Sequence, residues 1–282
     1  MRWPGYQHVF FDCDSTLTRV EGIDVLADSD EKRARVAALT DEAMNGTLDL
    51  EEVYGQRLNA IQPTRADVQD IRRVYKKTVV EDAQLVIATL QALGHDVYII
   101  SGGLFQAVVD FGRHLGVARD HIRAVDLAYN QLGSDWWKPK EYAWDEPYMT
   151  FARGSLTVSD GKSEIVAELL QGKTGRSLLV GDGTSDLLAG RAVDLFVGFG
   201  GVVTRPRVAA EAPAFLSTAS LAPILALAAG PAAIRRLQNA QQRAVFRKGL
   251  QLIAGDGNLE FKDERLNAKF FAAYQTVHSG TD

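Results

Sequence analysis

Two aspartates separated by one residue follow a short apolar run near the start of the chain. Asp12 and Asp14 come directly after Val9–Phe11, in the stretch HVFFDCDST. Residues two apart on an extended backbone point the same way, so both carboxylates can face one bound atom while Cys13 faces elsewhere. Because carboxylates repel each other and resist burial, the pair indicates a bound cation or a shared proton.

Further polar residues stand directly after later apolar runs. Ser101–Gly103 forms the sequence SGG, Asp182 and Asp186 lie in GDGTSD, and Lys162 begins KSEIVAELL. Carboxylates with no cysteine or histidine ligand nearby suit a hard ion such as Mg²⁺, which proteins usually bind together with phosphate and water. A lysine at a helix start and glycine amides open to close approach favour a phosphate. Together these residues predict metal-assisted phosphate chemistry.

The elements that must position these residues are short β-rich runs closed by small or acidic residues. They read as buried parallel strands at 8–14, 96–103, 177–183 and 193–201. Helical patterns at 80–94 and 162–173 fit crossover helices between them. The sequence therefore predicts an α/β fold with a doubly wound parallel sheet, whose strands end at one crevice that receives the polar residues.

Three other segments do not follow this alternation. Residues 20–78 contain amphipathic helical patterns and no strand, which predicts an inserted helical cap on a core of 1–19 and 79–229. An aromatic, turn-rich stretch at 126–157 predicts an elaborated β-hairpin. Within the predicted C-terminal helical appendage, 230–282, a helical pattern from Pro231 to Gly249 bears basic side chains and no acidic ones. We expect it to pack on the core or to form a homodimer contact.

Composition excludes some classes of protein. The chain has 282 residues, 46% of them hydrophobic, with a formal net charge of −5. This charge gives no electrostatic reason to expect nucleic acid or an anionic membrane as a partner. One cysteine, no leader-like segment and no long apolar span favour a soluble protein in a reducing compartment, hence the cytoplasm.

The motifs carry a family resemblance. In order and spacing, DCDST, SGG, the lysine of GKS and GDGTSD resemble the four motifs of the haloacid dehalogenase-like (HAD) phosphatases. More narrowly, FFDCDSTLTRVEGIDVLA, MNGTLDLEEVYGQRL, LFQAVVDFGRHLGV and DLFVGFGGVVTRPRV resemble the phosphoserine phosphatase branch of that family, over roughly residues 6–227. The resemblance implies hydrolysis of a small phosphomonoester through an aspartyl-phosphate.

It also implies residue roles. Asp12 would be the nucleophile and Asp14 the proton donor and acceptor. Mg²⁺ would be held by Asp12, Asp182 and the main-chain carbonyl of Asp14. The remaining positions would bind the phosphoryl group or support the site. They are Ser101, Gly102, Gly103 and Lys162 for the phosphoryl group, and Gly183, Ser185 and Asp186 as supports. The family often has asparagine where this chain has Ser185.

The cap residues implied by the resemblance would select the substrate. Glu21 would bind an ammonium group and Arg57 a carboxylate, with Met44 and Leu50 closing the pocket. O-phosphoserine offers both groups, and its hydrolysis belongs to serine biosynthesis. The residues leave other interpretations open: Glu21 and Arg57 as a solvated salt bridge, and Met44 and Leu50 as ordinary apolar cap residues.

Two other functions compete with this one. The first is a phosphatase or phosphotransferase that acts on another small phosphorylated metabolite. The second is a non-catalytic binding protein that retains the fold. The second predicts that catalytic residues are lost, whereas Asp12, Asp14, Lys162 and Asp182 are all present.

Overall fold

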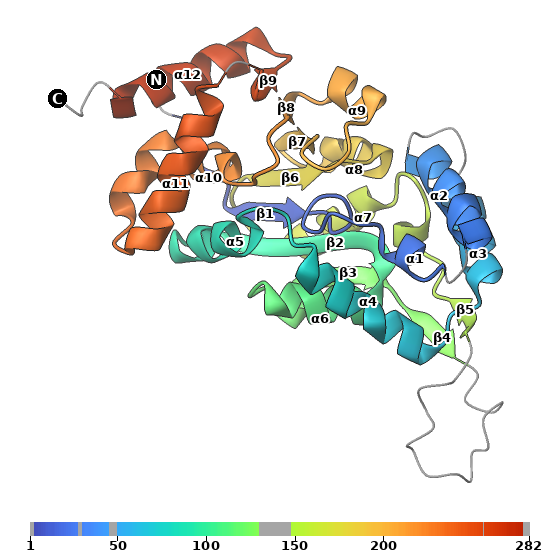
Figure 1. Cartoon of the computed structure of the whole chain (residues 1–282). Helices are drawn as coiled ribbons and strands as arrows, with labels where there is room; N and C mark the ends of the chain where they lie inside the picture. Colours follow the sequence, from blue (N-terminus) through green and yellow to red (C-terminus); the bar gives the residue numbers. More distant parts are fainter. Residues whose placement is uncertain (1–2, 28–29, 45–49, 130–147, 256, 279–282) are drawn as a thin grey trace.

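A central sheet of seven strands organises the protein in a computed structural model, which describes residues 3–27, 30–44, 50–129, 148–255 and 257–278 (Figure 1). The strand order is β3-β2-β1-β6-β7-β8-β9. The strands are β1 His8–Phe11, β2 Asp96–Leu104, β3 Ile122–Val125, β6 Ser177–Gly181, β7 Leu195–Phe199, β8 Ala214–Leu216 and β9 Leu259–Phe261. All neighbouring pairs are parallel except β8 with β9.

Helices cover both faces of this sheet. Successive residues of a strand point to opposite sides, so a strand of apolar residues makes both faces apolar. Val9 and Phe11 of β1 belong to one apolar cluster and Phe10 to another. The first cluster includes side chains of α5 Ala83–Ala92, α6 Phe105–His114, α10 Pro223–Ala229, α11 Ala240–Ile253 and α12 Glu264–His278. The second includes α7 Lys162–Leu170, α8 Thr184–Ala189 and α9 Pro206–Glu211. The predicted α/β, doubly wound class is confirmed.

Four helices lie between β1 and α5 in the chain; the first three lie beyond the carboxyl ends of the strands, and the fourth runs beside α6 (Figure 1). They are α1 Gly22–Val25, α2 Asp30–Met44, α3 Leu50–Ile61 and α4 Arg65–Lys77. The chain leaves and re-enters the core at adjacent points, where Thr18 and Val79 form an antiparallel bridge. This junction sets the base of the helical segment directly beside the end of β1.

A second, two-stranded sheet lies next to α3. Its antiparallel strands are β4 Leu127–Tyr129 and β5 Tyr148–Phe151. The ring of Phe151 lies 5.0 Å from that of Tyr54 on α3. Part of the predicted hairpin lies outside the described residues, including its aromatic residues Trp136, Trp137, Tyr142 and Trp144.

The continuous helix expected from Pro231 to Gly249 is wrong, because the structure has two separate helices there. Residues Pro231–Arg236 form a 3-10 helix, η5, and α11 begins only at Ala240. The reason is local, because the Asn239 side chain accepts hydrogen bonds from two backbone N–H groups at the start of α11 and so caps a new helix. Lys248 pairs with Glu81 at 2.7 Å, so the segment packs on the core.

The tail also completes the sheet, which the sequence did not predict. β9 pairs with β8 and forms the edge of the sheet, and Trp3 packs edge-on against Phe270 of α12 with ring centroids 4.9 Å apart. Among the residues that the structure describes, no helix is both long enough and apolar enough to cross a bilayer.

Candidate active site

A cavity opens at the carboxyl ends of the central strands β2, β1 and β6, which are neighbours in the sheet. Asp12 follows β1, Ser101 lies near the end of β2 and Asp182 follows β6. The predicted site residues that line the cavity are Asp12, Asp14, Glu21, Arg57, Ser101, Gly102, Gly103, Lys162 and Ser185. Residues from four separate sequence motifs and from the helical segment therefore meet in one place.

Two of the remaining predicted residues, Gly183 and Asp186, lie beside this cavity without lining it. Asp186 is buried beside it, and its carboxylate accepts a hydrogen bond from the Gly183 N–H at the start of α8, at 3.1 Å. Met44 ends α2 and Leu50 begins α3, but their side chains lie outside the described part of the structure. Their predicted contact with a substrate stays a prediction.

Lys162 bridges two carboxylates at the floor of the site. Its Nζ lies 2.7 Å from Asp12 Oδ1 and 2.7 Å from Asp186 Oδ1. Burial by itself would lower the pKa of Lys162, but the two adjacent carboxylates raise it above its usual value. Burial, together with the charge of Asp12, raises the pKa of Asp186 to about 7. Lys162 therefore stays positively charged inside the protein.

Three buried carboxylates form a candidate cation site. Asp12, Asp182 and Asp186 each offer an oxygen, and these oxygens lie within 4.8 Å of one another. Burial and the charges of Glu21 and Asp12 raise the pKa of Asp182 well above its usual value. An all-oxygen donor set with this much negative charge fits a hard divalent cation. Asp12 and Asp182 are two of the three predicted ligands, the third being the main-chain carbonyl of Asp14, and the cluster also contains Asp186, which was expected only as a support.

Arg205 is a site residue that the sequence analysis missed. It is 4% exposed, and its guanidinium lies 3.3 Å from Asp182 Oδ2, 2.9 Å from Asp41 Oδ1 and 3.9 Å from Glu21 Oε1. It therefore connects the core to α2 and partly balances the acidic cluster. Arg205 follows strand β7 and precedes α9, and the other site residues also follow strands of the sheet. This position could have identified Arg205 as a site residue from the sequence.

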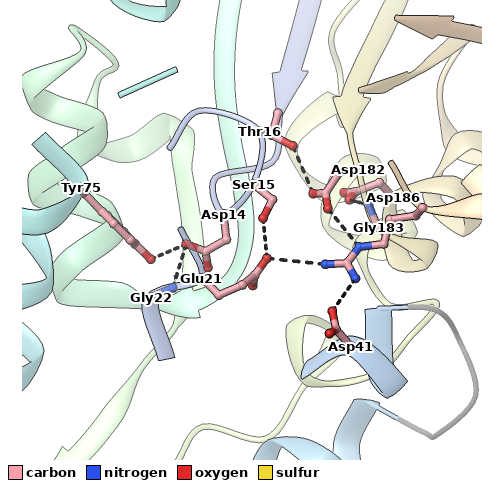
Figure 2. A network of polar contacts seen from close by, with 11 residues as sticks. Asp14, Ser15, Thr16, Glu21, Gly22, Asp41, Tyr75, Asp182, Gly183 and Asp186 are labelled. Carbon is pink, nitrogen blue, oxygen red and sulfur yellow. Dashed lines mark hydrogen bonds and ion pairs between the residues drawn. The ribbon is translucent and has the colours of Figure 1, made fainter. Parts of the chain in front are cut away.

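Asp14 is held by groups from the helical segment, as Figure 2 shows. The Tyr75 hydroxyl and the Gly22 N–H both donate to its Oδ1, the latter at 3.2 Å. Burial and the negative charge of Glu21 raise the pKa of Asp14 well above its usual value. A carboxyl in this environment keeps a proton more readily than an exposed aspartate does. Tyr75 is the second residue that the sequence analysis missed.

Glu21 and Arg57 both face the cavity rather than bulk solvent. Arg57 is 3% exposed, and its guanidinium lies 5.6 Å from the centre of the Tyr54 ring. The Glu21 carboxylate accepts a hydrogen bond of 2.7 Å from the Ser15 hydroxyl. The solvated salt bridge considered as an alternative does not describe them. One positive and one negative side chain thus line the same cavity as the four phosphate-binding candidates Ser101, Gly102, Gly103 and Lys162.

Known proteins share this sequence and fold. Residues 6–194 match the haloacid dehalogenase-like hydrolase family. The chain is 34% identical to a phosphoserine phosphatase of Drosophila melanogaster over 205 residues, which cover 72% of this chain and 71% of that protein. It is 32% identical to a phosphoserine phosphatase of Mus musculus over 202 residues, which cover 71% and 84%.

Solved structures agree at the level of the fold. A phospho-aspartyl intermediate analogue of phosphoserine phosphatase superposes with a TM-score of 0.65 and 24% identity, over 78% of this chain and 98% of the other. Family, relatives and fold agree with the family resemblance found in the sequence. The chain is a phosphatase, similar to phosphoserine phosphatases, and belongs to the haloacid dehalogenase-like hydrolase family.

Proposed function

We propose that the protein hydrolyses O-phosphoserine to serine and phosphate. The observation that carries the proposal is that Glu21 and Arg57 line the same cavity as Asp12, Ser101 and Lys162. A free amino acid bearing a phosphate presents one ammonium, one carboxylate and one phosphoryl group. The cavity offers one acidic partner, one guanidinium fork and a phosphate-binding set, so each group of the substrate has a partner of opposite charge.

The proposed reaction has two displacements. In the first, the Asp12 carboxylate attacks phosphorus, the bond from phosphorus to the serine oxygen breaks, and Asp14 donates its proton to that oxygen. In the second, water attacks the aspartyl-phosphate, Asp14 takes a proton from the water, and Asp12 is released as a carboxylate with inorganic phosphate. Ser101, the glycine amides after it and Lys162 would hold the phosphoryl oxygens throughout.

We propose that Asp12 and Asp182, with the main-chain carbonyl of Asp14 and the support of Asp186, hold Mg²⁺. The buried cluster of carboxylate oxygens supports this assignment. When bound, Mg²⁺ supplies positive charge that stabilises the phosphoryl oxygens. Lys162 orients Asp12, since its Nζ lies 2.7 Å from Asp12 Oδ1.

The same proposal divides the chain by role. Residues 1–19 and 79–229 would be the catalytic core, 20–78 a cap that selects the substrate, and 230–282 an appendage. The position of α1 to α3 beyond the strand ends supports this division (Figure 1). We place the reaction in serine biosynthesis in the cytoplasm.

The Arg57→Ala variant tests the substrate. Phosphoethanolamine keeps the ammonium of phosphoserine and lacks its carboxylate, whereas 3-phosphoglycerate keeps a carboxylate and lacks the ammonium. Since loss of one partner leaves a buried charge in the cavity unsatisfied, we expect wild type to prefer phosphoserine over either analogue by about 30- to 1,000-fold in kcat/KM. Arg57→Ala should reduce the ratio of kcat/KM for phosphoserine to that for phosphoethanolamine, chiefly because phosphoserine becomes a poorer substrate.

A cap arginine away from the cavity gives the matched control. Arg73 lies on α4 with its side chain 69% exposed, so Arg73→Ala should keep the wild-type preference. If wild type hydrolyses phosphoethanolamine or 3-phosphoglycerate as well as phosphoserine, the amino-acid pocket is wrong. A phosphatase for another small phosphomonoester would then replace the proposal.

A further inference from the structure

The two carboxylate oxygens of Asp14 lie in different surroundings. Oδ1 accepts hydrogen bonds from the Tyr75 hydroxyl and from the Gly22 N–H (Figure 2). Oδ2 lies on the other side, next to Gly103, where a Cβ atom added to that glycine would stand only 2.9 Å away from it. Because Gly103 and Asp14 both line the cavity, Oδ2 is the oxygen beside the phosphate-binding loop.

Tyr75 reaches Asp14 from behind the cavity rather than from within it. It lies in the last turn of α4, it is fully buried, and it is absent from the residues that line the cavity. Its ring packs against Phe111 of α6, with centroids 5.2 Å apart, which fixes the direction of the hydroxyl. Tyr75 is therefore placed to act on Asp14 and not on a substrate.

The contact depends on glycine at position 22. A Cβ atom on Gly22 would stand 2.0 Å from the Tyr75 hydroxyl oxygen, closer than any real contact allows. The same glycine donates its N–H to Asp14, so one position provides both the second hydrogen bond and the space for the first. The Tyr75 hydrogen bond thus requires a residue without a side chain at position 22.

We propose that Tyr75 is a positioning residue that directs the proton of Asp14 into the cavity. The Tyr75 hydroxyl and the Gly22 N–H both donate to Oδ1, so Oδ2 is the oxygen turned toward the phosphate-binding loop and the one that exchanges a proton with the leaving oxygen. As the bond from phosphorus to the leaving oxygen breaks, that proton passes from Oδ2 to the leaving oxygen. The inference rests on the proposed function only in that Asp14 is the proton donor.

The test compares leaving groups in Tyr75→Phe, which removes the hydroxyl and keeps the ring. An alkoxide such as serine's needs a proton to leave, whereas p-nitrophenolate leaves without one. We expect kcat/KM for phosphoserine to fall about 10- to 100-fold, and that for p-nitrophenyl phosphate to fall less than about 3-fold. The kcat/KM value reports the steps up to phosphoenzyme formation, where Asp14 acts as the donor. General damage to the site would lower both values alike.

A second variant and a control support the comparison. Gly22→Ala should displace the Tyr75 hydroxyl and produce the same unequal losses. Tyr274 is also buried, and its hydroxyl donates to the Leu250 carbonyl at 2.8 Å in the C-terminal segment. Tyr274→Phe should leave both substrates unaffected.

The outcomes separate this inference from the proposed function. If wild type does not hydrolyse phosphoserine, the proposed function fails, and glycerol 2-phosphate then serves as the alkyl substrate for the same comparison. Unequal losses in Tyr75→Phe support the positioning role with either alkyl substrate. Equal losses on the alkyl and aryl phosphates, or no loss on either, overturn it.

Discussion

Asp12→Asn is expected to lower kcat for phosphoserine by at least ~10⁴-fold while the protein stays folded. An amide oxygen is too weak a nucleophile to form the covalent intermediate, so the first displacement stops. The fold should survive, because asparagine has the same shape and its oxygen can still accept the hydrogen bond from Lys162 that Asp12 Oδ1 accepts at 2.7 Å. Lys162 also keeps its second partner, Asp186. Steady-state kinetics, acid trapping of the phosphoenzyme and a thermal melt measure the three effects.

Asp194 provides the matched control. Its carboxylate accepts a hydrogen bond of 2.8 Å from the Ser177 N–H, at the end of β6 that is opposite the cavity. Asp194→Asn makes the same chemical change at a distance from the site, and kcat should stay near the wild-type value. A trapped phosphoenzyme in Asp12→Asn, or a kcat within about tenfold of wild type, would contradict the nucleophile assignment.

The elements that position the site could be predicted because their signals are local. Apolar runs closed by small or acidic residues predicted β1, β2, β6 and β7, and the amphipathic patterns at 20–78 predicted the helical segment that contains α1 to α4. The C-terminal segment could not be predicted in the same way. Asn239 starts a new helix within an apparently continuous pattern, and β9 has only three residues that pair with a strand more than forty residues earlier in the chain.

The difference between local signals and contacts of distant segments also explains which site residues could be predicted from the sequence. Asp12, Ser101 and Asp182 stand at the ends of strands, so sequence position alone places them at one edge of a parallel sheet. Tyr75 and Arg205 reach the site only through tertiary packing. A tyrosine on the apolar side of an amphipathic helix looks like any core residue, and its partner Asp14 is 61 positions away. An arginine before a short helix looks like a surface cation, whereas in the structure Arg205 is buried and contacts Asp182 and Asp41 of α2.

Removal of divalent metal is expected to lower kcat by at least ~10³-fold, and Mg²⁺ should restore it. The carboxylates of Asp12, Asp182 and Asp186 lie close together and are buried. Burial, with the charges of Glu21 and Asp12, holds the pKa of Asp182 well above its usual value. A buried carboxyl with a raised pKa destabilises the folded state when it is ionised at neutral pH, and a bound cation offsets that cost. Activity assays with excess chelator, followed by added Mg²⁺, measure the effect.

Thermal melts give a reading that does not depend on activity. A cation that binds only the folded protein raises the melting temperature, so Mg²⁺ should raise it in wild type. Asp182→Asn should lose most of this increase. Asp160→Asn should keep it, because Asp160 is an exposed partner of Arg191 on the surface. Mn²⁺ should substitute for Mg²⁺, while Ca²⁺ should raise the melting temperature without restoring activity, since its longer bonds and higher coordination number disturb the in-line geometry. Full activity in excess chelator, or an equal Mg²⁺ shift in Asp182→Asn, would show that these carboxylates do not hold the ion.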